Sequence, residues 1–135
     1  MAQPTLQVTG YRGIWGDTLT SEIAKKYAGA YAQFVKSEFP DKENPTILIG
    51  RDGRESGKEI ALAIIPIMQS FGMNVIDGDI LPTPTLMFGV NKYNYDGAVI
   101  ITASHNPIEY NGIKFVVKGG RLTNESEVEK IKTFL

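Results

Sequence analysis

Residues 47–76 read ILIGRDGRESGKEIALAIIPIMQSFGMNVI, and most of the predicted architecture follows from this stretch. It begins with a short apolar run, Ile47-Leu48-Ile49, which is typical of a buried strand. Apolar residues then recur at helical spacing up to Phe71, and Gly72 is a typical helix stop. Val75-Ile76 is the next apolar run. A strand, a helix and a strand in this order predict a parallel β-α-β unit.

The helix of this unit carries a predicted start and a predicted bend. Ser56 is followed three residues later by Glu59, which matches a capping box and places the first helical residue at Gly57. Pro66 removes one backbone donor from the helix interior, so we expect a bend there. The face predicted to pack in the core consists of Ile60, Ile64, Ile67, Met68 and Phe71.

Two more helices and another strand extend the alternation. A helix capped by Thr20 is expected to run to about Ser37. Its apolar face is predicted to lie in the core and consists of Ile23, Tyr27, Tyr31 and Phe34. Thr83-Pro84 is typical of a helix cap followed by proline in the first turn, and a short helix with Leu86, Met87 and Val90 follows. Ala98 to Ile101 form the third buried strand.

The two ends of the chain do not continue this alternation of parallel strands and helices. Leu6 to Val8 can be a short strand or an extended arm, and the glycines at 10 and 13 predict a loop. Ile113 to Val117 form a strand, which we expect to be antiparallel because the link from Ile101 is short and holds no helix. After it come a tight turn at Gly119-Gly120 and a helix capped by Asn124 and Glu127 that carries Val128, Ile131 and Leu135.

Taken together, these elements predict an α/β protein: a three-layer α/β/α sandwich with a mixed, mostly parallel sheet of about four strands. The length of 135 residues suits one domain, spanning residues 1–135. We found no internal repeat or linker-like run that would divide it.

Composition excludes several classes of function. Lys plus Arg is 14 and Asp plus Glu is 15, so the net charge is −1, which argues against a nucleic-acid partner. The chain has no cysteine, which excludes disulfides and thiolate metal sites and suits a cytoplasmic location. No segment resembles an export signal, so the sequon at Asn124 is read as accidental. The longest apolar run, Ile60 to Met68, is too short to span a membrane.

Three polar segments are predicted to meet at the carboxyl ends of the parallel strands, where α/β sheets bind ligands. These are residues 50–54, 79–85 and 102–111. The last contains Ser104, His105 and Asn106 in succession, with Lys114 close behind. Serine and asparagine in a loop often do no more than bond their own backbone. The position of the loop and the presence of the only histidine favour chemistry, and the cations favour a serine that carries a phosphoryl group.

Four motifs in the same order resemble the α-D-phosphohexomutases, which comprise the phosphoglucomutases, phosphomannomutases and phosphoglucosamine mutases. The phosphoserine loop is matched by Thr102-Ala103-Ser104-His105-Asn106-Pro107 with Tyr110-Asn111-Gly112-Ile113-Lys114. The other three motifs are Tyr11-Arg12-Gly13, Gly50-Arg51-Asp52-Gly53-Arg54 with Ser56-Gly57, and Pro82-Thr83-Pro84. The resemblance covers nearly the whole chain, but only the first of the four domains of that family.

The resemblance implies a role for each matching position. Ser104 would carry the phosphoryl group, with His105 and Lys114 beside it to assist proton transfer and balance charge. Arg12 would reach the phosphoserine from the first loop, and Asn106 would help hold the loop. For three further residues we favour a structural ion-pair cluster beneath the loop, made of Arg51, Asp52 and Arg54.

The implied reaction interconverts a sugar 1-phosphate and a sugar 6-phosphate through a bisphosphate intermediate. Mg²⁺ would bind the phosphate on Ser104, and a sugar 1,6-bisphosphate would act as activator. The substrate is a hexose phosphate, and the other domains of the same enzyme are the expected partners.

The aspartate-glycine metal loop of the family does not occur here, and Asp77-Gly78-Asp79 is the nearest run. The fragment alone is therefore expected to be inactive. Two alternatives remain open: a non-catalytic module that binds anions or partner domains, and a small phosphocarrier that uses Ser104 or His105.

Overall fold

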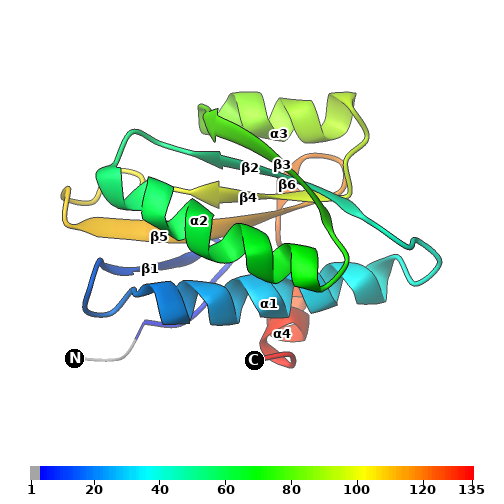
Figure 1. The fold of residues 1–135 in the computed structure, drawn as a ribbon, viewed down its shortest axis with the longest axis horizontal. Coiled ribbons are helices and arrows are strands. Elements are labelled where there is room, and N and C mark those ends of the chain that lie inside the picture. The colour runs from blue at the N-terminus through cyan, green and yellow to red at the C-terminus, as the bar shows by residue number, and fades with distance from the viewer. Residues whose placement is uncertain (1–3) are drawn as a thin grey trace.

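The protein is a three-layer α/β/α sandwich, as the sequence predicts (Figure 1). The computed structural model describes residues 4–135, so residues 1–3 of the predicted domain lie outside the described part. Three helices, α1, α2 and α4, cover one face of the sheet, and α3 covers the other. The elements in chain order are β1 (Tyr11–Ile14), α1 (Ser21–Glu38), β2 (Thr46–Arg51), α2 (Glu55–Ser70), β3 (Asn74–Ile80), α3 (Thr83–Lys92), β4 (Gly97–Ile101), β5 (Tyr110–Val117), β6 (Arg121–Leu122) and α4 (Glu125–Lys132).

The sheet has the order β1-β5-β4-β2-β3, with β6 paired to β5. Strand β2 is parallel to both β3 and β4, which confirms the predicted β-α-β units. Strand β5 is antiparallel to β4, with Ile101 opposite Ile113, which confirms the prediction made from the short link. The carboxyl ends of β2 and β4 therefore lie at one end of the molecule, together with the start of β5.

The sheet has six strands rather than about four, because two short strands were not predicted. The segment predicted as a loop contains β1, which pairs antiparallel with β5. Gly13 lies inside this strand and packs closely against Thr18: a Cβ at position 13 would lie 2.8 Å from Thr18 Oγ1. The glycine indicates tight packing and not a turn. Strand β6 follows the confirmed turn at Gly119-Gly120, where both residues have positive φ.

The core lies on both faces of the sheet. The larger part packs under α1 and α2 and contains Tyr31, Phe34, Ile60, Ile64 and Met68, all predicted core residues. Tyr27 packs against it and lies beside Tyr11, with the rings tilted by 33° and their centroids 4.6 Å apart. The smaller part lies under α3 and consists of Leu48, Leu86, Val90, Ala98, Ile100 and Val116.

Helix starts were predicted correctly where a side chain caps the helix. Thr20 accepts a hydrogen bond from the Ile23 amide, and Asn124 and Glu127 form a complete capping box. The predicted capping box at Ser56 is wrong, because α2 begins at Glu55 and the Ser56 hydroxyl accepts a hydrogen bond from Asn111.

Two smaller predictions at element ends are also corrected, and of the two alternatives for residues 6–8 the strand is not borne out. Helix α3 begins at Thr83 with Pro82 as its cap residue, one position earlier than predicted, because the fixed φ of proline suits either place. Leu135 lies beyond α4 and is 44% exposed, since α4 ends at Lys132. Leu6 is buried, but residues 6–8 form no strand beyond one isolated bridge between Gln7 and Gly10.

Pro66 lies within α2, which remains helical from Glu55 to Ser70. The proline leaves the carbonyl of Leu62 without its helical donor. Both residues are exposed, and Leu62 is 65% exposed, so water can bond that carbonyl. The exposed position explains why the helix tolerates a proline there; the bend remains a prediction.

Candidate functional site

The three polar segments predicted to converge do meet at one end of the sheet. The Asp52 amide donates to the Ile101 carbonyl at 3.1 Å, and the Leu81 amide donates to the Arg51 carbonyl at 3.0 Å. The Thr102 amide donates to the Gly112 carbonyl at 2.9 Å. These bonds bring the loops after β2, β3 and β4 together, on the side of the arrowheads of β2 and β4 in Figure 1.

Ser104 is the exposed tip of this site. Its φ is +55°, in the left-handed region that costs a residue other than glycine about 1–3 kcal/mol. The Ser104 amide donates to Thr102 Oγ1 at 3.0 Å, which fixes the turn. A strained backbone of this kind persists only where its surroundings hold it, and it is common at functional sites.

Lys114 is the side chain that meets the serine. It lies on β5, and its Nζ donates to Ser104 Oγ at 2.9 Å. Burial, and then the positive charge of Arg12, lower the pKa of Lys114 below its usual value. A lysine whose pKa is lowered in this way gives up its proton more readily than an ordinary lysine.

Arg12 lies on the same face as Lys114, on the neighbouring strand. Arg12 pairs with Gly112 in the ladder between β1 and β5. A Cβ on Gly112 would lie 3.0 Å from Arg12 Cγ, so the glycine leaves room for the arginine stem. Gly10, with φ of +99°, leaves room for Lys114, because a Cβ there would lie 2.8 Å from Lys114 Cγ. Two cations are thereby held side by side behind the serine.

His105 and Asn106 follow the serine in different settings. His105 is exposed, and no hydrogen bond joins it to any other residue in the range 4–135. Asn106 donates from both its amide and its side chain to the Ala103 carbonyl, at 3.1 and 2.9 Å, and so closes the loop on itself. The structure therefore brings Ser104, Lys114 and Arg12 together and leaves His105 free at the surface.

The predicted ion-pair cluster is present for two of its three residues. Asp52 and Arg54 pair beneath the loop, with Arg54 Nε 3.3 Å from Asp52 Oδ2. Arg51 instead contacts Asp79, with Arg51 Nη2 2.6 Å from Asp79 Oδ1. The arginine at 51 is thus tied to β3, and not to the serine loop.

Two further residues of the site belong to the motif quoted from the sequence but were given no role there. Thr102 Oγ1 donates to Asp52 Oδ2 at 2.7 Å while it accepts the Ser104 amide. Asn111 is fully buried and donates to Ser56 Oγ at 2.7 Å. Polar side chains that directly flank a glycine or follow a buried strand are the signal that could have identified them.

The residues present do not fit a complete magnesium site. Mg²⁺ prefers six oxygen ligands, several of them from carboxylates, phosphates or water. Within residues 4–135, no group of three or more acidic, histidine or cysteine side chains could hold a metal. Asp52, the carboxylate beneath the loop, already accepts bonds from Thr102 and Arg54.

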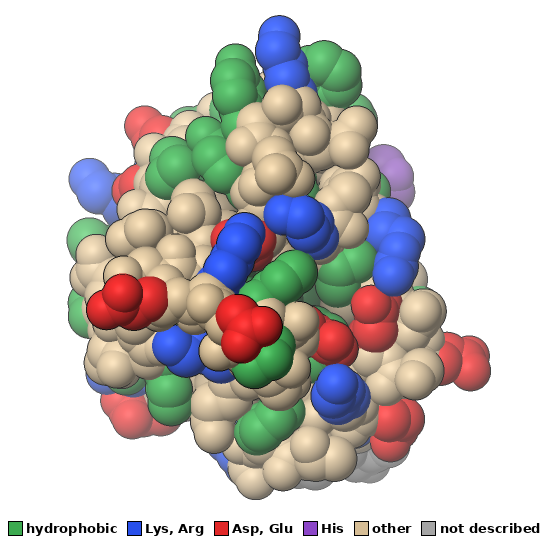
Figure 2. Space-filling model, turned by 90° about the vertical axis from the view of Figure 1, so that its right-hand side faces the viewer, with side chains coloured by type: hydrophobic (Ala, Val, Ile, Leu, Met, Phe, Trp, Pro, Cys, Tyr) green, Lys and Arg blue, Asp and Glu red, His purple; other side chains and the backbone are tan. Residues whose placement is uncertain are grey.

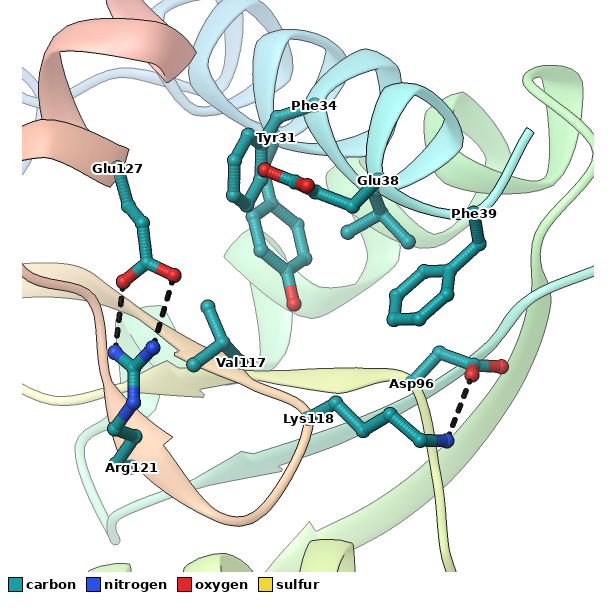
Figure 3. A pocket seen from close by; sticks show the side chains of 10 residues that line it. Tyr31, Phe34, Glu38, Phe39, Asp96, Val117, Lys118, Arg121 and Glu127 are labelled. Carbon is teal, nitrogen blue, oxygen red and sulfur yellow. Dashed lines mark hydrogen bonds and ion pairs between the residues drawn. The ribbon is translucent and has the colours of Figure 1, made fainter.

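A cavity of about 210 Å³ lies at the opposite end of the sheet from Ser104 (Figure 3). Aromatic side chains line it, with charged groups around them that pair with one another. Arg121 contacts Glu127 through both ends of its guanidinium, at 2.7 and 3.1 Å, and Lys118 contacts Asp96. Figure 2 shows this end of the molecule, where basic and acidic side chains alternate around hydrophobic ones. Because these charges are paired, we place the candidate site at Ser104.

Within the described part of the chain, no helix is both long and apolar enough to cross a lipid bilayer.

The fold and the site define a class: an α/β/α domain with a serine loop backed by cations at the carboxyl edge of a mixed sheet. Residues 4–135 match the family described as phosphoglucomutase/phosphomannomutase, alpha/beta/alpha domain I. The chain belongs to this family.

Named relatives agree with this assignment. A phosphoglucomutase/phosphomannomutase of Thermococcus kodakarensis is 43% identical over 82% of this chain and 24% of its own length. A phosphoglucosamine/phosphogalactosamine mutase of Sulfurisphaera tokodaii is 41% identical over 90% of this chain and 26% of its own. The solved structure of a phosphoglucomutase/phosphomannomutase family protein from Burkholderia thailandensis has a TM-score of 0.81 at 25% identity, covering 98% of this chain and 30% of that one. The chain thus spans about a quarter of the length of its curated relatives.

Proposed function

We propose that this chain is the phosphoserine-bearing domain of a phosphohexomutase, with Ser104 as the residue that takes up the phosphoryl group. The observation that carries the proposal is the 2.9 Å contact between Lys114 Nζ and Ser104 Oγ on an exposed, strained turn. A serine in this setting is accessible to a ligand, and it has a proton acceptor and positive charge beside it.

The transfer to Ser104 starts from a sugar bisphosphate. The bond between Ser104 Oγ and phosphorus forms while the bond between phosphorus and the sugar oxygen breaks. Lys114 takes the serine proton and so becomes a cation beside the new phosphoserine. The departing sugar oxygen lies on the opposite side of the phosphorus and takes its proton from His105 or from water, so the products are phosphoserine and a sugar monophosphate. The reverse step, with the sugar turned over, interconverts the 1- and 6-phosphates. The rate depends mainly on positioning and on cations around the transferring group.

The remaining residues support this step. Arg12 and Lys114 balance the charge of the phosphoryl group, His105 serves as a second proton carrier from its exposed position, and Asn106 holds the loop. The phosphate on Ser104 would supply one ligand to Mg²⁺, with the other ligands from outside this chain. A hexose phosphate as substrate, a sugar 1,6-bisphosphate as activator, three further domains as partners, and a cytoplasmic location complete the proposal.

Inorganic phosphate should stabilise this chain through Arg12 and Lys114. A ligand that binds only the folded state at ten times its Kd adds about 1.4 kcal/mol, which is about 5 °C in Tm for a domain of this size. We expect Arg12→Ala and Lys114→Ala each to remove most of that shift in a thermal melt. Lys26→Ala removes an exposed lysine on α1 and should keep it. A full shift in both site variants would place the anion site elsewhere and contradict the proposal.

A further inference from the structure

We infer that Arg54, oriented by Asp52, is the positioning residue that keeps Ser104 within reach of Lys114. Arg54 does not touch the serine hydroxyl and has no part in the transfer itself. It acts on the backbone of the loop that carries the serine. The functional meaning of this inference rests on the proposed role of Ser104, whereas the positioning itself can be tested separately.

The guanidinium of Arg54 donates to four backbone carbonyls of one loop. Nη1 donates to Pro107 at 2.6 Å and to Tyr110 at 2.9 Å. Nη2 donates to Asn106 at 2.7 Å and to Ser104 at 3.2 Å. The loop from Ser104 to Tyr110 thus encloses a single side chain that begins 50 residues earlier in the sequence.

Asp52 fixes the direction of this guanidinium. Its Oδ1 accepts the Arg54 amide at 3.0 Å, and its Oδ2 accepts Arg54 Nε at 3.3 Å. The same Oδ2 accepts the Thr102 hydroxyl at 2.7 Å, and that hydroxyl in turn accepts the Ser104 amide. The carboxylate therefore holds the loop from two sides: through Thr102 before the serine and through Arg54 after it.

The chemistry of these contacts requires arginine. The four carbonyls accept from Nη1 and Nη2, and Asp52 accepts from Nε, so all three nitrogens of the guanidinium are used. Lysine cannot replace this always charged group with its single nitrogen. The side chain of Arg54 is only 11% exposed, and its bonds to Asn106 and Tyr110 are partly buried, while those to Ser104 and Pro107 lie at the surface. Hydrogen bonds that involve a charged group are about twice as strong as neutral ones.

The need for such an anchor lies in the backbone of Ser104. A left-handed φ is unfavourable for serine, so an unheld loop would relax toward other conformations. Relaxation of the loop would move the Ser104 hydroxyl away from Lys114. Lys114 is ten residues further along the chain, and a single 2.9 Å hydrogen bond joins the two side chains. Arg54 thus converts a flexible polar loop into a preorganised one.

Hydrogen exchange of this chain measured by NMR tests the inference. Three loop amides have bonds of their own and serve as probes: Ser104, Asn106 and Tyr110. We expect Arg54→Met to speed their exchange at least tenfold, while amides of β2 and β4 keep their rates. The Nζ and Cε signals of Lys114 should shift toward those of a solvated lysine, which loss of stability alone would not cause. Arg54→Lys should restore less than half of the protection.

Arg51→Met is the matched control, because Arg51 contacts Asp79 and not the loop. It should leave the three amides and the Lys114 signals unchanged. Asp52→Asn provides a second route if Arg54→Met does not fold, and it should raise loop exchange in the same direction. Unchanged loop exchange in a folded Arg54 or Asp52 variant, or an equal increase in Arg51→Met, would overturn the inference. Neither outcome depends on whether Ser104 takes up phosphate, so failure of the proposed function would be seen separately.

Discussion

Replacing Gly97 with alanine should destabilise the domain by about 3 kcal/mol, at the upper end of the usual range for overpacking a core. Gly97 starts β4 under the ring of Tyr31, which is fully buried and stacks on Phe115 with ring centroids 4.5 Å apart. A Cβ at 97 would collide with the Tyr31 hydroxyl and lie 2.8 Å from the Val116 carbonyl. That hydroxyl donates to the same carbonyl at 2.7 Å, so it cannot move without losing the bond.

The expected loss corresponds to about 10 °C in Tm, measured by calorimetry or circular dichroism. Gly53→Ala is the control, because Gly53 is exposed and a Cβ there meets nothing within 4 Å. Adding Tyr31→Phe to Gly97→Ala removes the colliding oxygen and should restore part of the stability. A Gly97→Ala protein as stable as the wild type would show that the packing around Tyr31 is looser than described.

Asp96→Asn should cost about 2–4 kcal/mol, because a buried carboxylate that accepts several bonds is replaced by a neutral amide. Asp96 is 4% exposed and accepts from Lys42 at 2.5 Å, from the Thr46 amide at 2.8 Å and from Lys118 at 3.3 Å. These bonds join the starts of β2 and β4 to the end of β5. Urea unfolding measures the loss, and Asp41→Asn, at an exposed aspartate, should change the midpoint little.

The Asp96 carboxylate should also make the free energy of unfolding depend on pH in the acid range. Burial by itself would raise the pKa of Asp96, but the bonds from Lys42, Thr46 and Lys118 outweigh it and hold the pKa below its usual value. A lowered pKa contributes stability that is present above the unfolded value, near 3.9, and is lost as the pH falls through the lower folded value. Asp96→Asn should therefore make the free energy of unfolding fall less steeply below about pH 4. If the slope of unfolding free energy against pH does not change, the acid dependence comes from other carboxylates.

The central β-α-β order was predictable from sequence because each strand is a short apolar run between unambiguous helices. The capping box at Asn124 and the antiparallel β5 were predictable for similar reasons, since each depends on residues close in the chain. Strand β1 was not predicted because the glycine at position 13 has two opposite interpretations. A glycine can mark a turn or a close approach, and only the position of Thr18 decides between them.

The site was predictable as a set of residue types, and less so as a geometry. The loop motif placed Ser104 and Lys114 in one site, and the structure brings their side chains into contact. The four carbonyl bonds of Arg54 were not predictable, because they depend on how the backbone from Ser104 to Tyr110 turns. The pairing of Asp96 with Lys42, 54 residues apart, likewise depends on the completed sheet. Contacts of this kind are set by tertiary packing and leave no local pattern.

The most direct test of the account is the position of the phosphoryl group. The intact enzyme, with the further domains that the proposal assigns to it, should be isolated under native conditions, digested at neutral to alkaline pH, which preserves phosphohistidine, and mapped by mass spectrometry. We expect one phosphoryl group on Ser104, absent from Ser104→Ala and retained in His105→Ala. A phosphoryl group on His105 would support a phosphocarrier instead, and a Ser104 that is never phosphorylated, even after incubation with a hexose 1,6-bisphosphate and Mg²⁺, would contradict the proposed function.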